Sequence, residues 1–518
     1  MGQSFKMNKI LFVFSIVSGA ALVLFILPLL NLFTQFLTIT NSLHEDWAVL
    51  LRITFFTCEQ ALLSSFVAGV FGCALAFICF ETRVVGVKVI AILSHVTFFL
   101  PALIVALAIV GVWGNHGWVG KFFPESGVYG WLGILLGHLF FNFSVYFRLV
   151  GQSLLESEKS EEKVALSLGA NRWVVFWSVT FQKIKKSVIQ SFFLVFIYCL
   201  SSFVIILILG GGPRFTSLEV AIYQAIKVDF NLKLAALLAS IQLLFCFVAH
   251  LFSGTASEVR IGFRPRLQEL IYQCRTGVGE KLVFAVTWFF FCLVVLLPMI
   301  YLFVKGGTSI SKLSPNDILG TLKFSILLGL KVAIVSSFLA FSSAYLARHF
   351  RSEKVKRWVS FSSILPVAVS NMVFGAALLT WAPSFRDLGS EGLWGVVVIQ
   401  ALSALPLSFR IFSESFSKIE NEIYFSAKSL GASHSQLLTQ VELPMLKKSI
   451  ASSIVTGLGI SLGEVGALLL FESSGNATFS IWLFRLMGKY QFGEANAVGV
   501  LLLFTMVCIF LVKESWEH

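Results

Sequence analysis

Charged side chains are scarce in this sequence of 518 residues. Asp, Glu, Lys and Arg make up 13% of it, about half of the share found in soluble proteins. Hydrophobic residues make up 57%, and the mean hydropathy is +0.87. This balance excludes a soluble globular protein and indicates a polytopic membrane protein.

The sequence also lacks two kinds of motif. Its eight cysteines are scattered and show no C-x-x-C spacing, so neither a metal site nor a disulfide framework is indicated. The phosphate-binding pattern G-x-x-x-x-G-K-[ST] is absent, so the chain has no nucleotide loop of its own. We expect no cofactor, no metal and no ATPase activity in this chain.

Long apolar windows define the expected fold class. A spanning helix needs about 20 mainly apolar residues, and twelve windows with two formal charges or fewer fit this length. The sequence therefore predicts an all-α integral membrane protein with about twelve transmembrane helices. The windows are 9–45, 53–80, 88–121, 125–148, 186–214, 233–258, 281–305, 322–347, 357–386, 391–410, 450–471 and 494–513.

The positive charges indicate an orientation. The net charge is +12, which in a soluble chain would suggest a nucleic-acid partner. With the N-terminus placed in the cytoplasm, 27 of the 39 Lys and Arg residues fall in inner loops and eight in outer loops. Cytoplasmic loops of membrane proteins carry such an excess. We therefore expect both termini in the cytoplasm and no nucleic-acid partner.

An internal repeat divides the chain into two halves. Residues 147–187 align without gaps on residues 409–449 at a constant offset of 262, and 13 of the 41 positions are identical. The expected organisation is a six-helix half over 1–256, a cytoplasmic linker over 257–281 and a second six-helix half over 282–518. An even number of helices gives both halves the same orientation, as in transporters built from parallel repeats.

Each repeated segment contains a loop that is expected to lie in the cytoplasm, 148–187 and 410–449. A charged, helix-favouring start is followed by Ser-Leu-Gly, which ends a helix well, and then by a second amphipathic stretch. The simplest interpretation is a connector whose charges only fix topology. Both copies keep the same Ala-x-Ser-Leu-Gly-Ala sequence. We therefore favour the interpretation that the two loops present the same surface and dock on two copies of the same partner.

These loops resemble the cytoplasmic signature of the integral membrane permeases of ABC importers. That signature is Glu-Ala-Ala, three residues, Gly, nine residues and Ile-x-Leu-Pro; the initial Glu is absent from both copies, and Leu-Pro is absent from the first. The resemblance implies coupling to two copies of a separate ATPase subunit. The coupling residues it implies are Glu158, Ala165, Gly169, Ala170, Glu420, Ala427, Gly431, Ala432, Leu443 and Pro444.

One acidic residue lies in the middle of an apolar segment. Glu464 stands in Ser461-Leu-Gly-Glu-Val-Gly466, and an ionisable group at this depth costs about 2.5–3.5 kcal/mol on insertion scales. Its repeat partner is Ser202. We expect Glu464, Ser461 and Ser202 to line the translocation path. The alternative is that Glu464 is protonated or paired and only holds helices together.

Other polar residues in apolar segments have simpler interpretations. Glu59 and Lys331 lie in corresponding helices, and each is expected to reach a membrane face rather than to pair with the other. His95 and His138 are single histidines in apolar helices, and hydrogen-bonded packing is favoured over a ligand role.

The resemblance extends to the fused permeases of bacterial thiamine importers. It rests on Leu209-Gly-Gly-Gly-Pro213, on Thr216-Ser-Leu-Glu-Val-Ala-Ile-Tyr-Gln224 and on Gly137-His-Leu-Phe-Phe-Asn142, in this order and spacing. It implies uptake of thiamine or its phosphate esters from a periplasmic binding protein across the bacterial inner membrane, in contact with membrane lipid. Fused ferric-iron permeases are the alternative within the class.

Two other classes remain open. A proton-coupled secondary transporter also often has twelve helices in two halves, but it would carry ionisable groups in many helices and no paired docking loops. A channel or a membrane scaffold has no positive feature in this sequence.

Overall fold

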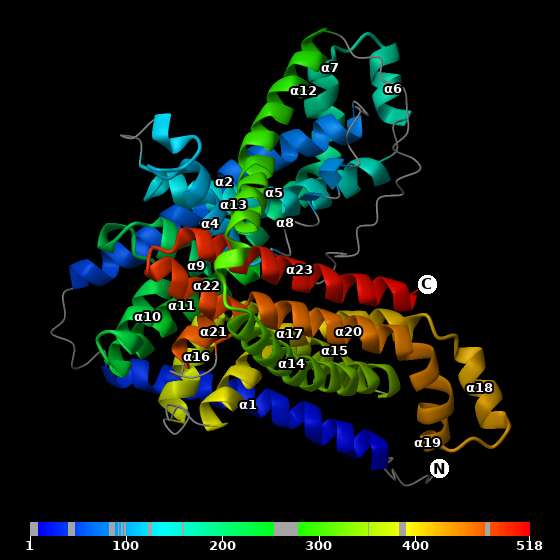
Figure 1. Ribbon diagram of the computed structural model, residues 1–518. Helices are drawn as coiled ribbons and strands as arrows, with labels where there is room; N and C mark the ends of the chain where they lie inside the picture. The colour runs from blue at the N-terminus through cyan, green and yellow to red at the C-terminus, as the bar shows by residue number, and fades with distance from the viewer. Residues whose placement is uncertain are drawn as a thin grey trace. The chain divides into compact units, whose positions relative to one another are not determined.

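The computed structural model describes residues 9–39, 47–81, 89–91, 93–94, 97, 100–122, 127–157, 160–252, 278–350, 352–382, 390–471 and 477–517. Within these ranges all regular secondary structure is helical (Figure 1). The expected all-α class is therefore confirmed for the described part of the chain.

Helix breaks determine how many spans the structure shows. Among the described residues, eight helices are long and apolar enough to cross a bilayer, and a ninth span results if the bent pair Glu353–Ala368 and Asn371–Trp381 is counted as one. This pair turns by 99°. The predicted windows 88–121, 186–214 and 450–471 hold shorter or interrupted helices. A hydropathy window detects an apolar segment but not a backbone break within it.

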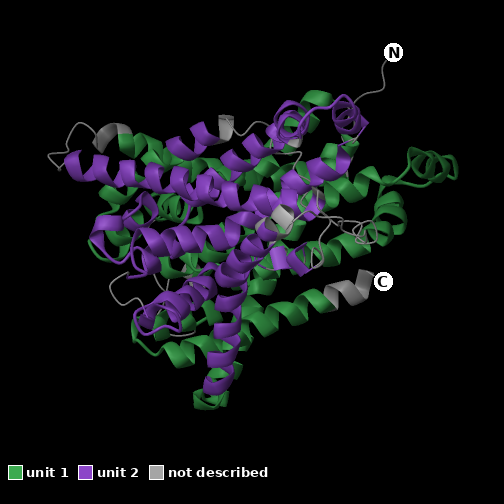
Figure 2. Cartoon of the chain, turned by 90° about the horizontal axis from the view of Figure 1, so that it is seen from above, with its two compact units in different colours: residues 1–44, 222–243, 310–518 green, residues 45–221, 244–309 purple. Residues whose placement is uncertain are grey.

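The chain forms two compact units, coloured separately in Figure 2. Unit 1 comprises residues 1–44, 222–243 and 310–518, and unit 2 comprises residues 45–221 and 244–309. Two helices, α10 (Leu218–Lys227) and α11 (Leu232–Phe252), contribute to both units. The units thus do not follow the order of the chain.

The helices of unit 1 come mainly from the second half of the sequence. They are α1 (Lys9–Ile39), α14 (Pro315–His349), α15 (Glu353–Ile364), α16 (Asn371–Trp381), α17 (Ser390–Ser417), α18 (Asn421–Ser429), α19 (His434–Gln436), α20 (Leu443–Gly463), α21 (Gly466–Leu470), α22 (Phe479–Gly488) and α23 (Phe492–Glu517), with short turns η7 (Ile310–Lys312), η8 (Leu365–Ala368) and η10 (Leu437–Glu442).

The helices of unit 2 come mainly from the first half. They are α2 (Trp47–Glu81), α4 (Ala102–Trp113), α5 (Trp131–Glu156), α6 (Ser160–Ser167), α7 (Arg172–Val175), α8 (Phe181–Leu200), α9 (Val204–Leu209), α12 (Val278–Phe291) and α13 (Leu297–Ser309), with short turns η1 (Gly120–Phe122), η3 (Phe176–Thr180), η4 (Pro213–Phe215) and η6 (Cys292–Leu296).

The first helix of the chain packs within unit 1 on helices of the second half. Helix α1 lies against α14 and α16. The Phe14 ring meets Tyr345 edge-on with centroids 5.0 Å apart, and Phe25 stacks on Phe374 at 5.4 Å. Aromatic pairs of this geometry contribute stabilisation in addition to that from the apolar surface area they bury. The first helix of one half is therefore part of the core formed by the other.

The reverse packing occurs in unit 2. There α12, η6 and α13, which begin the second half, lie against α2, α5 and α4. A Cβ atom on Gly111 would stand 1.9 Å from the Tyr301 ring, so only glycine permits this approach of α4 to α13. The Tyr301 ring also meets Trp118 edge-on at 5.0 Å. Each half thus supplies its first helix to the other, a reciprocal exchange that local sequence patterns do not reveal.

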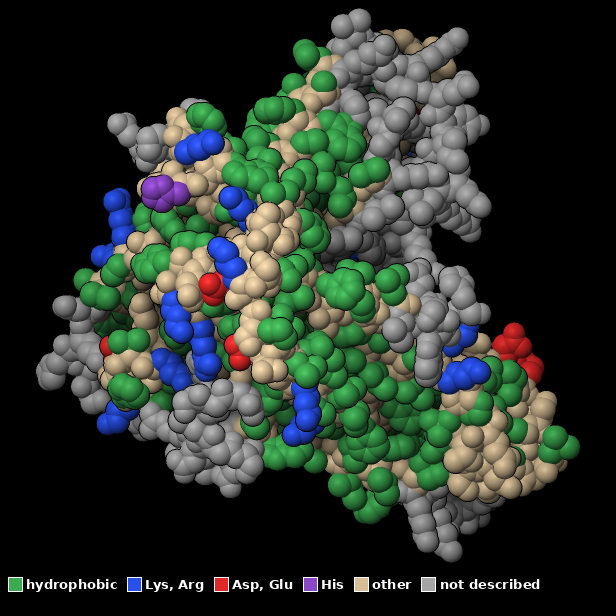
Figure 3. Space-filling model, in the orientation of Figure 1, with side chains coloured by type: hydrophobic (Ala, Val, Ile, Leu, Met, Phe, Trp, Pro, Cys, Tyr) green, Lys and Arg blue, Asp and Glu red, His purple; other side chains and the backbone are tan. Residues whose placement is uncertain are grey.

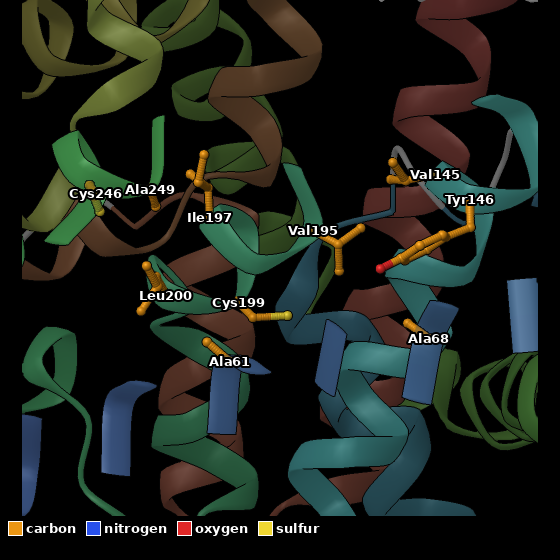
Figure 4. Packing of buried hydrophobic residues seen from close by; sticks show 10 residues of the cluster. All are labelled: Ala61, Ala68, Val145, Tyr146, Val195, Ile197, Cys199, Leu200, Cys246 and Ala249. Carbon is orange, nitrogen blue, oxygen red and sulfur yellow. The ribbon is translucent and has the colours of Figure 1, made fainter. Parts of the chain in front are cut away.

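Alanine and cysteine make up half of a buried cluster in unit 2. The buried cluster in Figure 4 combines α2, α5, α8 and α11 and includes Ala61, Ala68, Cys199 and Cys246. Small side chains let membrane helices approach closely. The Tyr146 hydroxyl, directed into this cluster in Figure 4, donates to the carbonyl of Ser65 at 3.0 Å. The cysteines here are free thiols that pack as small apolar groups, as the sequence predicts.

Much of the described surface on the face shown in Figure 3 is apolar. Hydrophobic side chains predominate over most of the coloured surface in Figure 3. Individual residues on the long helices are widely exposed, such as Phe55 at 70% and Phe504 at 67%. Large exposed apolar areas mark contact with a partner or a membrane, and the apolar helix lengths identify the membrane as the partner here.

Candidate coupling loops and helix breaks

The two repeated loops have the same structure. The first runs from the end of α5 through α6, α7 and η3 into α8, and the second runs from α17 through α18, α19 and η10 into α20. Both η3 and η10 are π-helical turns. Such turns are rare in proteins as a whole, but many of those that occur lie at functional sites. The predicted sequence of helix, turn and helix is present in both loops.

A glycine in the left-handed conformation makes the turn in each loop. Gly169 has φ +84° and Gly431 has φ +83°. The amide of Ala170 donates to the Ala165 carbonyl at 3.1 Å, and the amide of Ala432 donates to the Ala427 carbonyl at 3.0 Å. These bonds close the helix end as in a Schellman motif. The matching Ala-x-Ser-Leu-Gly-Ala sequences therefore encode matching turns.

The leucine before each of these glycines is exposed. Leu168 is 82% exposed and Leu430 is 89% exposed. Neither coupling helix, α6 or α18, has a fully buried residue. The two loops therefore expose a leucine at equivalent positions.

A second matched contact joins the ends of each loop. Ser153 and Ser187 share a hydrogen bond between their hydroxyl groups at 2.6 Å, and Ser415 and Ser449, which correspond to them at offset 262, do the same at 2.6 Å. Each bond ties the helix that enters the loop to the helix that leaves it. The repeat is thus preserved in hydrogen bonds and not only in residue identities.

The remaining predicted coupling residues lie next to α18 and at the start of α20, except for one that is not described. Glu420 precedes α18 and its side chain makes no capping hydrogen bond. Leu443 and Pro444 begin α20 directly after the π-helical turn η10, and the Leu443 amide donates to the Leu438 carbonyl of that turn. Glu158 lies outside the described residues.

The helix that follows each loop is interrupted at corresponding residues. Helix α8 ends at Leu200 and α9 begins at Val204; α20 ends at Gly463 and α21 begins at Gly466. Ser202 and Glu464 lie at these two breaks, and their offset is again 262. Transporters commonly place substrate sites at discontinuous helices. The predicted equivalence of Ser202 and Glu464 therefore coincides with a shared backbone feature.

Polar side chains from three helices surround the break in unit 1. The Glu464 carboxylate accepts a hydrogen bond from the Asn371 amide of α16 at 2.5 Å and from the Ala467 backbone amide at 3.2 Å. The Ser403 hydroxyl of α17 donates to the Asn371 side-chain oxygen. Glu464 thus bonds an amide in the first turn of α21 and connects this helix to α16.

A second link lies beside this one. The Ser461 hydroxyl donates to the Gln400 side-chain oxygen at 2.7 Å, and both residues are buried. Among the described residues, the Gln400 amide nitrogen has no hydrogen-bond partner. Because Gln400 precedes Ser403 by three residues on α17, both side chains lie on one helix face. Together with Glu464 and Asn371 these residues form what we call the polar cluster.

The sequence pattern predicts only part of this cluster. A formal charge and a motif point to Glu464 and Ser461, whereas neither points to Asn371, Gln400 or Ser403. A scan for formal charges cannot detect neutral polar side chains. Asn and Gln inside apolar windows would have been the signal, since such groups need partners in a membrane.

The other polar candidates are placed as follows. Glu59 is exposed on α2. The Lys331 amine lies over the Trp394 ring at 5.9 Å from its centroid, a cation–π contact. The His138 ring bonds the Ser64 hydroxyl at 2.8 Å, as the packing interpretation predicts. His95 lies outside the described residues.

Comparison with known proteins agrees with this geometry. The model of the family described as "Binding-protein-dependent transport system inner membrane component" matches twice, at residues 68–255 and 337–515. These segments together exceed half of the chain, and each holds one coupling loop and one helix break.

Curated relatives are similar over nearly the whole length. The thiamine transport system permease protein ThiP of Haemophilus influenzae is 28% identical over 87% of this chain and 86% of its own length. ThiP of Escherichia coli is 25% identical over 92% of both chains. The ferric transport system permease protein FbpB of Actinobacillus pleuropneumoniae is 23% identical over 88% of this chain and 70% of its own.

These matches confirm the predicted fused two-repeat permease of the inner membrane, a transport component whose ATPase is a separate subunit. The chain belongs to the family of binding-protein-dependent transport system inner membrane components.

Proposed function

We propose that this chain is the permease of an ABC importer that takes up thiamine or its phosphate esters. The observation that carries the proposal is similarity to thiamine permeases over about nine-tenths of the chain, including both coupling loops. Membership in the family implies a substrate-binding protein and an ATPase as partners. The binding protein delivers substrate on the periplasmic side of the bacterial inner membrane.

The two loops support an assembly with two ATPase subunits. Each loop presents one exposed leucine after a short helix, with the same turn and the same tie between its ends. A single chain with two equivalent surfaces binds two copies of one partner. In the proposed assembly both loops and both termini lie in the cytoplasm, the apolar helices contact membrane lipid, and 257–281 links the halves 1–256 and 282–518.

The polar cluster supports a place on the translocation path. Glu464, Ser461 and, in the first half, Ser202 lie at or next to helix breaks, and the Gln400 amide has a free donor among the described residues. Thiamine carries a permanent positive charge and ring nitrogens that accept hydrogen bonds. An ionised Glu464 would attract the cation, and the Gln400 amide would meet a ring nitrogen.

Uptake of labelled substrate tests the choice of ligand. A strain that lacks this gene is expected to lose uptake of labelled thiamine under vitamin limitation and to regain it when the gene is restored. Uptake of labelled ferric iron is expected to stay unchanged. Unchanged thiamine uptake in the deletion strain together with lost iron uptake would instead favour the ferric alternative.

The turn glycines give a prediction about coupling. Gly431→Val is expected to reduce retention of the ATPase about tenfold, because an L side chain in this conformation costs about 1–2 kcal/mol. No atom lies within 4 Å of the added Cβ position, so the effect comes from backbone conformation alone. Gly431→Asn is the matched control, since Asn adopts positive φ more readily. Equal retention in both variants, measured by co-purification, would contradict the assignment.

A further inference from the structure

In both loops a side-chain hydrogen bond at the same pair of positions joins the coupling helix to the π-helical turn that precedes the membrane helix. In the first loop the Thr180 hydroxyl donates to the Glu162 carboxylate at 2.8 Å. In the second loop the Tyr424 hydroxyl donates to the Glu442 carboxylate at 2.9 Å. The offset of 262 relates Glu162 to Tyr424 and Thr180 to Glu442. The acid and the hydroxyl have therefore changed places between the two halves while the bond itself is kept.

The surroundings of the two bonds match as well. Glu162 and Tyr424 are half-buried on their coupling helices, whereas Thr180 and Glu442 are buried at the ends of the π-helical turns η3 and η10. These turns lead directly into α8 and α20. A bond at this place joins a surface helix to the base of the interrupted membrane helix.

The second loop has further polar contacts. The Glu442 carboxylate also bonds the His349 ring nitrogen at 2.6 Å, at the end of α14. The Arg348 guanidinium donates to the Ile419 carbonyl at 3.0 Å and to the Asn421 side chain at 2.8 Å, and it lies over the Tyr424 ring. Burial, together with the nearby Glu442 carboxylate, raises the pKa of the Tyr424 hydroxyl, so the hydroxyl keeps the proton that it donates.

The first loop is attached differently. Residues 61–68 of α2 (ALLSSFVA) align with residues 333–340 of α14 (AIVSSFLA) at an offset of 272, so Ala76 and Phe77 correspond to Arg348 and His349. The Phe77 ring contacts Phe176 edge-on at 5.1 Å. The Lys183 amine lies 3.3 Å from the Glu161 carboxylate, an exposed pair of the kind that contributes little. The buried Glu442 carboxylate makes both of its bonds at Oε1, and its Oε2 has no partner among the described residues. Two bonds to one carboxylate hold the second loop more firmly than the single bond between Thr180 and Glu162 together with an apolar contact and a surface pair.

We propose that this bond, which we call the coupling latch, is the positioning contact through which each coupling helix moves together with the membrane helix that follows, and that the second latch is the firmer of the two. The inference rests on the proposed function, because it assumes that the loops engage an ATPase. Glu162, Thr180, Tyr424 and Glu442 are positioning residues that act through the loop. The coupling helices that the two ATPase subunits contact are therefore attached to their membrane helices with unequal strength.

Transplanting one latch into the other loop tests this inference. The variants are Glu442→Thr alone, Tyr424→Glu with Glu442→Thr, which copies the first latch into the second loop, and Thr180→Val in the first loop. Glu414→Gln is the control, because Glu414 is an exposed acid paired only with Lys418 among the described residues. The permease is purified with its ATPase and binding protein and reconstituted in liposomes. The rate of thiamine uptake and the rate of ATP hydrolysis are then measured separately.

Glu442→Thr is expected to lower uptake per ATP hydrolysed about tenfold or more, because it leaves the half-buried Tyr424 hydroxyl and His349 ring without their shared acceptor. Thr180→Val is expected to lower it about threefold, since one hydrogen bond is lost. The double variant is expected to recover to within about threefold of the wild type, as the transplanted acid again accepts the bond. ATPase retention is expected to stay unchanged in all three.

Two results would overturn the latch: no recovery in the double variant, or a Glu442→Thr complex that couples like Glu414→Gln. If Glu442→Thr fails to insert into the membrane, Thr180→Val decides alone, and unchanged uptake per ATP in that variant would reject the inference. A wild-type complex that neither retains an ATPase nor transports thiamine would instead refute the proposed function.

Discussion

Replacement of both Leu168 and Leu430 by Asp is expected to abolish retention of the ATPase by the permease. These side chains are 82% and 89% exposed, so the isolated chain loses almost no packing when they change. Burial of one leucine at an interface contributes about 1.5–3 kcal/mol. Loss of two such contacts corresponds to an affinity lower by about 100-fold or more.

Co-purification from membranes measures this effect. Each single substitution is expected to weaken retention partially, since one loop still docks. The double replacement by Met is the control, because Met keeps an apolar side chain of similar volume and is expected to retain the ATPase. Retention of the ATPase by the double Asp variant at wild-type level, with equal amounts of permease in the membrane, would remove these leucines from the interface.

Glu464→Ala is expected to reduce thiamine uptake about 10- to 100-fold. The substitution leaves the Asn371 amide and the Ala467 backbone amide without their acceptor, and each unpaired buried donor costs about 1–3 kcal/mol. It also removes the only formal charge of the polar cluster. Initial uptake rates in whole cells, normalised to permease in the membrane, provide the measurement.

Glu464→Gln separates a path role from a packing role. Gln retains an oxygen that accepts from Asn371 or Ala467 but removes the negative charge that would attract a cation. Normal membrane amount and thermal stability with low uptake are expected if Glu464 lines the path. Low stability with a normal uptake rate per molecule would instead show that Glu464 only holds α16 and α21 together. Glu59→Gln, at an exposed position on α2, is the matched control.

The amino-acid pattern predicts the apolar segments and the coupling loops because both have local causes. Burial in lipid requires long apolar windows, and a left-handed turn requires glycine at 169 and 431. These features depend on a few neighbouring residues. Among the described residues, the structure accordingly shows the two turns and apolar helices in these windows, although backbone breaks interrupt some of the helices.

Other features depend on contacts between distant residues. The exchange of first helices requires Gly111 to meet Tyr301 and Phe14 to meet Tyr345, which no local window encodes. An alignment based on residue identity does not detect the coupling latch, because it aligns Glu162 with Tyr424 and Thr180 with Glu442. The hydrogen bond is conserved between the halves, whereas the residues that make it are not.

The number of ATPase subunits per permease tests the central claim most directly. Native mass spectrometry of the complex purified through the permease is expected to show one permease chain with two ATPase subunits, and the Leu168→Asp and Leu430→Asp single variants are each expected to lower the occupancy of one of them. A wild-type complex that holds a single ATPase subunit per permease chain, or none, would contradict the account.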